Sequence, residues 1–188
     1  KDTLHNAMQQ KEVVINVVNY DITQQVNLSS AEYSSDVDEF VKSGLTPLDS
    51  DLVAPRRVKE SPVSLECEVR DVLHMGEEGG AGNLVMCVVK KMHIADDVLS
   101  ENGGIDQDAI DLVGRLGKAW WVRASGDALF ELAPPKLGIG VDQIPDVIRR
   151  STILTGNNLG QLGSEITLPT AEEVEAKKND FDVRRILQ

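Results

Sequence analysis

An alternating stretch in the first half of the chain constrains its fold more than any other feature. Val63, Leu65, Cys67 and Val69 fall on one side of an extended chain, and Glu66 falls with other polar or charged residues on the opposite side. This period of two predicts a β-strand with one apolar face and one face in water. Strands of that kind are typical of antiparallel sheets, so we expect antiparallel pairing.

The residues that follow this strand predict a hairpin. Gly76–Asn83 is rich in glycine, and Leu84–Val89 is a continuous apolar run that we expect to form a strand buried on both faces. A direct return from one strand to the next supports antiparallel pairing. The loop also carries Glu77 and Glu78, whose charges would repel a phosphate, so we interpret it as a flexible turn.

Short helices and strands are expected on both sides of this hairpin. β-branched runs predict strands, helical spacing of apolar residues predicts helices, and proline or glycine marks the ends. These signals predict strands at 12–18, 119–124 and 129–132, and helices at 1–10, 21–32, 36–44, 106–116, 145–150, 157–162 and 171–178. Gly44 is expected to end its helix in the usual C-terminal position. This order of elements predicts an α+β fold or an all-β barrel with appended helices.

The first residues of the chain, Lys1, Asp2 and Thr3, open the first of these helices. Asp2 and Thr3 are residue types that favour a helix N-cap, and Leu4 begins the apolar face. A helix start carries unpaired backbone N–H groups and the positive end of the helix dipole. A lysine and a hydroxyl beside it therefore suit a phosphate, and an ordinary capped surface helix is the alternative interpretation.

The charge balance limits the partners of the chain. Its 188 residues carry 19 basic and 31 acidic side chains, for a net charge of −12, which argues against a nucleic-acid partner. No apolar run is long enough to cross a bilayer, so no membrane partner is expected. The two cysteines, Cys67 and Cys87, make no disulfide framework, and we interpret them as reduced residues of a cytoplasmic protein.

Catalytic motifs are scarce in this sequence. His5, His74 and His93 lie far apart without a partner at metal-ligand spacing, so no metal site is expected. The sequence also lacks the GxSxG elbow and the glycine-rich cradles for dinucleotides and nucleoside triphosphates, and we assign no catalytic residue. An enzyme of this kind would take its chemistry from a cofactor.

Two adjacent tryptophans are a further candidate contact. In a strand the rings of Trp120 and Trp121 point to opposite faces, so we expect one in the core while the other covers a flat ligand or a subunit contact. Arg115 and Arg123 lie nearby in the sequence and would add positive charge. Packing alone is the alternative explanation for this pair of rings.

Several blocks of this sequence, in this order along the chain, resemble the flavin reductase-like family, which has an FMN-binding split barrel. The blocks are Lys1–Asn6, Val13–Val18, Phe40 to Thr46, Val58–Cys67, Gly82–Val89, Gly114–Gly117 and Ile144 to Gly160. The resemblance therefore covers nearly the whole chain. It implies a mainly β fold, namely an FMN-binding split β-barrel that is antiparallel and Greek-key-like, with appended helices.

The resemblance also implies a cofactor site, in which the first residues of the chain meet the phosphate and ribityl end of FMN. The FMN-binding residues that it implies are Lys1, Asp2, Thr3, Asn6, Arg115 and Trp121. The implied function is NAD(P)H-dependent reduction of flavin by hydride transfer to FMN, with NADH or NADPH as co-substrate. A non-catalytic flavin-binding or electron-transfer protein of the same fold is the alternative. Family members are typically homodimers, so a homodimer is expected.

Members of this family have a further N-terminal part of the barrel directly before the block that matches Lys1–Thr3. We therefore expect that this part of the barrel is absent from the chain and that residues upstream are missing. The domain prediction is a single flavin reductase-like domain over residues 1–188. Residues 136–188 are expected to form a helical C-terminal extension packed on it.

Overall fold

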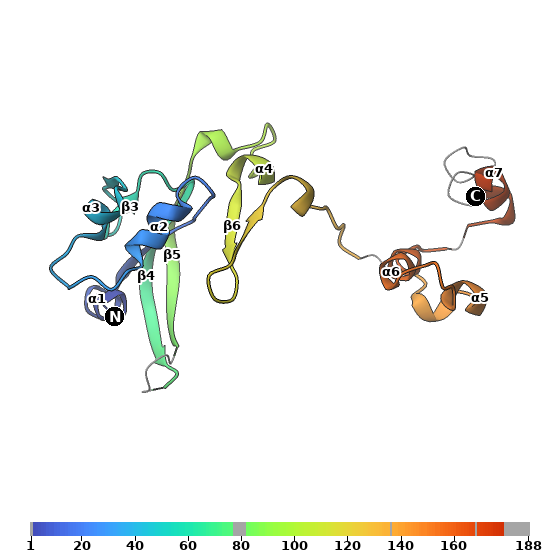
Figure 1. The fold of residues 1–188 in the computed structure, drawn as a ribbon, viewed down its shortest axis with the longest axis horizontal. Coiled ribbons are helices and arrows are strands. Elements are labelled where there is room, and N and C mark those ends of the chain that lie inside the picture. Colours follow the sequence, from blue (N-terminus) through green and yellow to red (C-terminus); the bar gives the residue numbers. More distant parts are fainter. Residues whose placement is uncertain (1, 77–81, 136, 168, 179–188) are drawn as a thin grey trace. The chain divides into compact units, whose positions relative to one another are not determined.

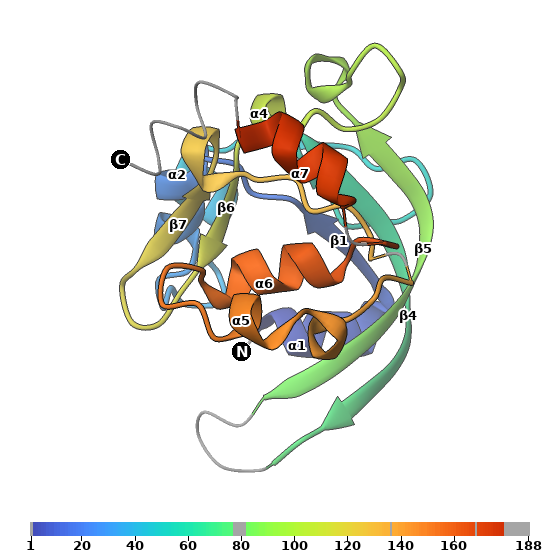
Figure 2. The same ribbon diagram turned by 90° about the vertical axis from the view of Figure 1, so that its right-hand side faces the viewer.

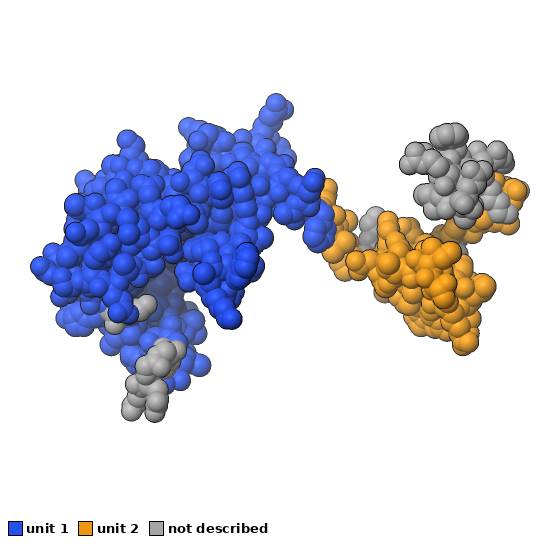
Figure 3. Space-filling view, in the orientation of Figure 1, with its two compact units in different colours: residues 1–130 blue, residues 131–188 orange. Residues whose placement is uncertain are grey.

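The computed structural model of the chain divides into two compact units, residues 1–130 and residues 131–188 (Figure 3). The packing of residues 136–188 on a single domain stays a prediction. The residues that the structure describes are 2–76, 82–135, 137–167 and 169–178. Among them, none of the helices is both long and apolar enough to cross a lipid bilayer.

The first unit consists of strands bordered by short helices (Figure 1). Its helices are α1 Asp2–Gln10, α2 Thr23–Ser29, α3 Glu39–Ser43 and α4 Gln107–Ile110, with 3₁₀ turns at Asp96–Val98 and Gly126–Ala128. Its strands are β1 Glu12–Asn16, β2 Pro47–Leu48, β3 Arg57–Val58, β4 Val63–His74, β5 Asn83–Ile94, β6 Leu112–Arg115 and β7 Trp121–Ala124.

Strand β4 is the centre of the largest sheet. The order β1-β4-β5 places it between two antiparallel neighbours, so that Cys67 lies opposite Val13 on one side and Val89 on the other. Figure 2 shows β4 and β5 curving together as one long hairpin. The register shifts after Glu66 and after Val69, and such irregularities let a strand bend. The prediction of antiparallel pairing is confirmed.

Two smaller sheets hold the remaining strands of the first unit. β2 pairs with β3, and β6 pairs with β7, both in antiparallel orientation. No ladder joins these pairs to the three-stranded sheet among the described strands, so the predicted barrel is not closed in this structure. The coarse prediction of a mainly antiparallel fold with several helices is confirmed.

The predicted helix at 106–116 is wrong beyond its first turn. Asp106 caps α4, but the helix ends at Ile110 because Asp111 adopts left-handed backbone with a φ of 48°. The next residues form β6, in which Leu112 lies opposite Ala124 of β7. Apolar residues at a spacing of three suggested a helix, and the hairpin pairing with β7 overrides that preference.

The prediction that the strand at 84–89 is buried on both faces is wrong. Leu84 is 50% exposed, Val88 is 44% exposed and Val89 is 49% exposed. β5 pairs with β4 alone and is an edge strand of the described sheet. Its side chains are therefore less covered by the rest of the unit than those of the central strand β4. Residues 77–81 of the predicted flexible turn lie outside the described residues.

The predicted strand at 129–132 is also wrong. Phe130 is 84% exposed and Leu132 is 83% exposed, and no described strand pairs with this segment. A segment with alternating apolar residues forms a strand only when a neighbouring strand hydrogen-bonds to it. The two prolines that follow also lack N–H donors for such bonds.

The core of the first unit lies where the start of β4 meets α4. Val63, Val98 and Ile110 form its buried centre, and Leu65 and Leu112 pack against them. Ile110 of α4 and Leu112 of β6 therefore belong to the same apolar cluster as Val63 and Leu65 of β4. This cluster holds the β6–β7 hairpin on the larger sheet. This attachment fixes the position of the hairpin that carries Arg115 and Trp121.

The described residues of the second unit form helices close to those that the sequence predicts at 145–150, 157–162 and 171–178. This unit contains α5 Asp146–Arg149, α6 Gly156–Gly163, α7 Ala171–Lys178 and a 3₁₀ turn at Val141–Gln143. Thr155 and Asn158 form a capping box at the start of α6. Gly138 approaches the end of α6 so closely that a Cβ there would clash with the carbonyl oxygen of Gly163.

Substitution of Gly44 tests the end of α3. Gly44 has a φ of 69°, a left-handed conformation that costs energy for a residue with a Cβ atom. We expect Gly44→Ala to lower the free energy of unfolding by about 1 kcal/mol, measured by urea denaturation followed by circular dichroism. Gly117→Ala is the control, because a Cβ there has no described atom within 4 Å. Equal losses in the two variants would contradict this interpretation.

Candidate functional site

The start of α1 presents unpaired polar groups to solvent. Asp2, Thr3 and Asn6 are exposed, and their side chains make no hydrogen bond with any described residue. Ala7, which is only 3% exposed, is the buried contact of this helix. Lys1 lies outside the described residues. Because the first amides of a helix have no intrahelical partner, this end can bind an anion without breaking an existing bond.

Arg115 and Trp121 lie side by side on the β6–β7 hairpin. They are opposite each other in the ladder, and the guanidinium carbon of Arg115 lies 5.2 Å from the centre of the Trp121 ring. Trp121 is half-buried and Trp120 is 73% exposed, so neither ring is in the core and the prediction of one core tryptophan is wrong. A guanidinium over an indole is a favourable cation–π arrangement.

A pocket of about 630 Å³ lies between α2 and this hairpin. We call it the hairpin pocket; α2, the Tyr20–Asp21 segment before α2, β6, β7 and the turn at Lys118–Ala119 line it. Arg115 and Trp121 both line it. Its volume falls in the range of small-molecule sites.

Backbone contacts explain why α2 lies over the hairpin. Asn19 forms an isolated antiparallel bridge with Leu112, and the amide of Tyr20 donates to the carbonyl of Asp111 at 2.9 Å. These bonds bring a segment near residue 20 against one near residue 112. The pocket is therefore a product of tertiary pairing.

The hairpin pocket contains a second stacked cation, Arg123. Its guanidinium carbon lies 3.9 Å from the centre of the Tyr20 ring, and its Nε and Nη2 atoms donate to the carboxylate of Asp111 at 2.8 and 2.6 Å. The hydrogen bond with Asp111 raises the pKa of Arg123, and the same bond lowers the pKa of Asp111. Arg123 is therefore held in place and its charge is balanced.

The structure brings together only part of the predicted cofactor site. Arg115 and Trp121 share the hairpin pocket, whereas no described residue of α1 lines it. The sequence analysis missed Tyr20 and Lys118 as pocket residues. The Gly117–Lys118 pair marks a turn with a cation, which was an available signal, but nothing in the sequence connects Tyr20 with residues about a hundred positions later.

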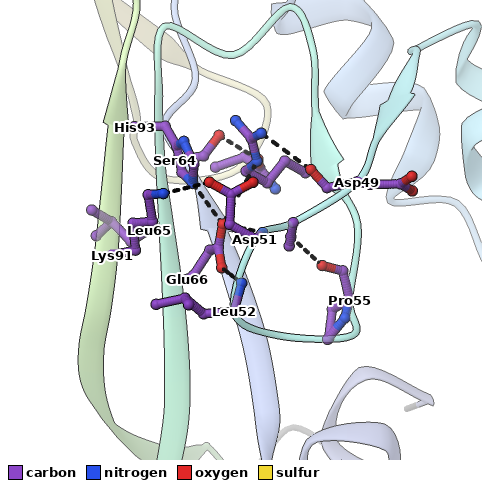
Figure 4. Close-up of polar contacts among 12 residues, drawn as sticks. Asp49, Asp51, Leu52, Pro55, Ser64, Leu65, Glu66, Lys91 and His93 are labelled. Carbon is purple, nitrogen blue, oxygen red and sulfur yellow. Dashed lines mark hydrogen bonds and ion pairs between the residues drawn. The ribbon is translucent and has the colours of Figure 1, made fainter.

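A buried carboxylate lies on the larger sheet, under the loop that follows β2 (Figure 4). Glu66 is 0% exposed, so the prediction that its face of the strand is in water is wrong at this position. Its oxygens accept hydrogen bonds from the amide of Asp51 at 2.9 Å and the amide of Leu52 at 2.6 Å. His93 Nε2 lies 2.5 Å from its Oε1 atom. The loop covers the polar face because this carboxylate binds its backbone.

The hydrogen bonds of Glu66 also determine its charge state. Burial by itself raises the pKa of Glu66, but the amides of Asp51 and Leu52 and the contact with His93 outweigh that effect and lower it to about 2. Glu66 is therefore ionised at neutral pH. Arg57, whose Nε lies 3.9 Å from Glu66 Oε1, adds a compensating positive charge.

Asp51, Glu66 and His93 are the one group of possible metal ligands among the described residues. Two loop amides already bind the oxygens of Glu66, and Lys91 pairs with the carboxylate of Asp51. A metal ion would have to displace these donors and would meet the charge of Lys91. The arrangement therefore favours a role in holding the loop on the sheet.

Comparison with solved structures defines the class of this fold. Component B of nitrilotriacetate monooxygenase from Bacillus cereus superposes with a TM-score of 0.64 at 24% identity, over 70% of this chain and 65% of that chain. A split-barrel protein of the flavin reductase type from Shewanella frigidimarina superposes with a TM-score of 0.62 at 29% identity, over 71% of this chain and 65% of that chain. The fold is that of split-barrel proteins.

The chain belongs to the flavin reductase like domain family, because residues 1–110 match the model of that family. A protein of Aquifex aeolicus is 30% identical over 127 residues, which are 68% of this chain and 63% of that protein. A protein of Halalkalibacterium halodurans is 36% identical over 118 residues, which are 62% of this chain and 56% of that protein. The chain thus spans less than two thirds of the length of these relatives.

Substitution of Glu66 tests the buried carboxylate. Because the pKa of Glu66 falls from its ordinary 4.5 to about 2 on folding, its contribution to stability is full above pH 4.5 and is lost as the pH falls towards 2. We expect Glu66→Gln to lower the free energy of unfolding at pH 7 by about 1 to 3 kcal/mol, since the loop amides lose a charged acceptor. The loss should shrink between pH 4.5 and pH 2 in urea denaturation curves.

Glu68→Gln, two residues further along β4, is the matched control. The Glu68 side chain is 57% exposed and pairs with Lys90 at 3.2 Å, so we expect a change below about 0.5 kcal/mol. A Glu66→Gln loss that is constant from pH 7 to pH 2 would show that the carboxylate charge does not hold the loop.

Proposed function

We propose that this protein is an FMN-binding oxidoreductase that reduces flavin with hydride from NADH or NADPH. The observation that carries the proposal is the match of residues 1–110 to the flavin reductase like domain family. The 29% identity to the Shewanella frigidimarina split-barrel protein, with a TM-score of 0.62, supports it. The chain spans only part of the length of its relatives, so the family assignment does not by itself give the activity. The activity is therefore part of the proposal.

The start of α1 fits the phosphate and ribityl end of FMN. Thr3 is exposed, its hydroxyl has no hydrogen-bond partner among the described residues, and it lies in the first turn of a helix of nine residues whose dipole favours an anion. In this proposal Lys1 and Thr3 bind the phosphate, while Asp2, which would repel it, caps the helix or accepts from a ribityl hydroxyl. Asn6 lies one turn further along and is a weaker contact.

Arg115 and Trp121 remain the candidates for contact with the flavin ring end. They offer a guanidinium donor and a flat aromatic surface within one pocket, which suits a planar ring whose oxygen and nitrogen atoms accept hydrogen bonds. When bound, FMN would supply the hydride-accepting chemistry, so the protein need only bind, orient and shield the reactants. This division of labour agrees with the absence of a catalytic motif from the sequence.

The proposal includes a homodimer. Leu84, Val88 and Met92 on β5 are 50%, 44% and 54% exposed, and exposed apolar side chains on an edge strand are suited to contact with a second subunit. A non-catalytic flavin-binding or electron-transfer protein is the alternative function, since the same cofactor site would serve both.

The visible spectrum and coenzyme oxidation of the full-length protein test the proposed function. We expect a flavin absorption band, or its appearance on addition of FMN, and oxidation of NADH or NADPH when FMN is present. FMN binding without oxidation of either coenzyme would favour the alternative function. A protein that neither contains nor binds flavin would contradict both functions.

Alanine substitutions at the start of α1 test the phosphate contact. We expect Lys1→Ala and Thr3→Ala each to weaken FMN binding by about 1 to 3 kcal/mol, because each removes a charge-assisted contact with the phosphate. Fluorescence titration with FMN measures the affinity. Gln9→Ala, at an exposed position in the last turn of α1, should leave it unchanged. Unchanged affinity in both test variants would place the phosphate elsewhere.

A further inference from the structure

The hairpin pocket has more cationic side chains than the described carboxylates around it pair with. Three cationic side chains line it in a chain with a net charge of −12, and Asp21 is the one carboxylate among its described lining residues. Arg123 is balanced by Asp111. Arg115 and Lys118 pair with no carboxylate among the described residues. The charge of Asp21 acts on Arg123, so Arg115 and Lys118 remain two cations without an ion-pair partner in one concave site, which favours a bound anion.

The local backbone holds these two cations beside one aromatic ring. Arg115 stacks on Trp121 at 5.2 Å, and its Nη2 atom donates to the carbonyl oxygen of Lys118 at 3.3 Å. Lys118 itself adopts left-handed backbone with a φ of 58°, within a turn closed by the bond from the Leu116 amide to the Trp120 carbonyl at 2.9 Å. The turn therefore keeps Lys118 close to the Arg115–Trp121 stack.

This combination suits a nucleotide whose sugar carries a phosphate. A base can stack against an aromatic or guanidinium plane, while arginine and lysine donate to the phosphate oxygens beside it. In Rossmann folds an arginine near the ribose accommodates the 2′-phosphate of NADP, and the same pairing of cation and phosphate is open to a cationic pocket of another fold. In the proposed function the phosphate of FMN lies at the start of α1, so the anion of the hairpin pocket is a second one.

We propose that the hairpin pocket binds the adenosine end of the nicotinamide coenzyme, and that Lys118 with Arg115 recognises its 2′-phosphate, so that the protein prefers NADPH to NADH. This inference rests on the proposed function and identifies its coenzyme. Arg115 and Trp121 then contact the adenosine end of the coenzyme, and this assignment replaces their contact with the flavin ring in the proposed function. Lys118 is a specificity-determining residue, which neither the sequence motifs nor the resemblance had assigned.

Binding of two adenosine nucleotides without nicotinamide tests the site independently of turnover. 2′,5′-ADP carries the 2′-phosphate and 5′-AMP lacks it, and quenching of the two tryptophans reports binding. We expect wild-type protein to bind 2′,5′-ADP at least about tenfold more tightly than 5′-AMP. Lys118→Asn, a residue type that tolerates left-handed backbone, should reduce that preference about fivefold to tenfold and leave the affinity for 5′-AMP within about twofold.

Lys11→Asn is the matched control, because Lys11 is also a lysine in left-handed backbone, with a φ of 59°, and does not line the hairpin pocket. We expect it to leave both affinities unchanged. Equal binding of the two nucleotides by wild-type protein, or an unchanged preference in Lys118→Asn, would overturn the inference. So would a Lys118→Asn variant that loses affinity for FMN but not for riboflavin, since the flavin phosphate would then occupy the pocket.

Failure of the proposed function gives a different result from failure of this inference. If the protein binds 2′,5′-ADP through Lys118 but oxidises neither coenzyme, the nucleotide site is supported and the proposed hydride transfer is wrong. If the protein oxidises NADH and NADPH equally well, and Lys118→Asn changes the KM of neither, the proposed function is supported and this inference is wrong.

Discussion

The buried carboxylate of Glu66 is the interaction on which the arrangement of the first unit depends. It lies on β4, the strand that pairs with both β1 and β5, and it binds two successive backbone amides of the loop after β2. A buried charge is stable only when its partners remain in place. Glu66 and its donors therefore hold the loop on the larger sheet, together with Glu12, which accepts from the amide of Ala54, and Lys91, which pairs with Asp51.

Charge is also the constraint that defines the candidate site. The chain is strongly acidic, yet Arg115, Lys118 and Arg123 gather around one pocket between α2 and the β6–β7 hairpin. Only Arg123 has a carboxylate partner among the described residues, so the pocket keeps a positive field in an acidic protein. The exposed polar groups at the start of α1 form a separate place for an anion, and two such places suit a reaction between two phosphate-bearing molecules.

Local patterns predicted the elements whose formation depends on neighbouring residues. The alternation around Cys67 predicted an antiparallel strand, and Gly44 marked a helix end that the structure places in left-handed backbone. The helix at 106–116 and the strand at 129–132 were wrong for one reason. In both segments a spacing of apolar residues was compatible with an element, but the presence or absence of a partner strand decided the conformation.

The sequence by itself determined the antiparallel pairing, the helix start at α1 and membership of a flavin reductase family, because short-range spacing and ordered blocks carry that information. Only the tertiary structure decided that Glu66 is buried rather than in water, since its partners come from a loop and from β5. Only tertiary pairing brought Tyr20 to Arg123 and made a pocket beside Trp121. Contacts between residues a hundred positions apart leave no local pattern to interpret.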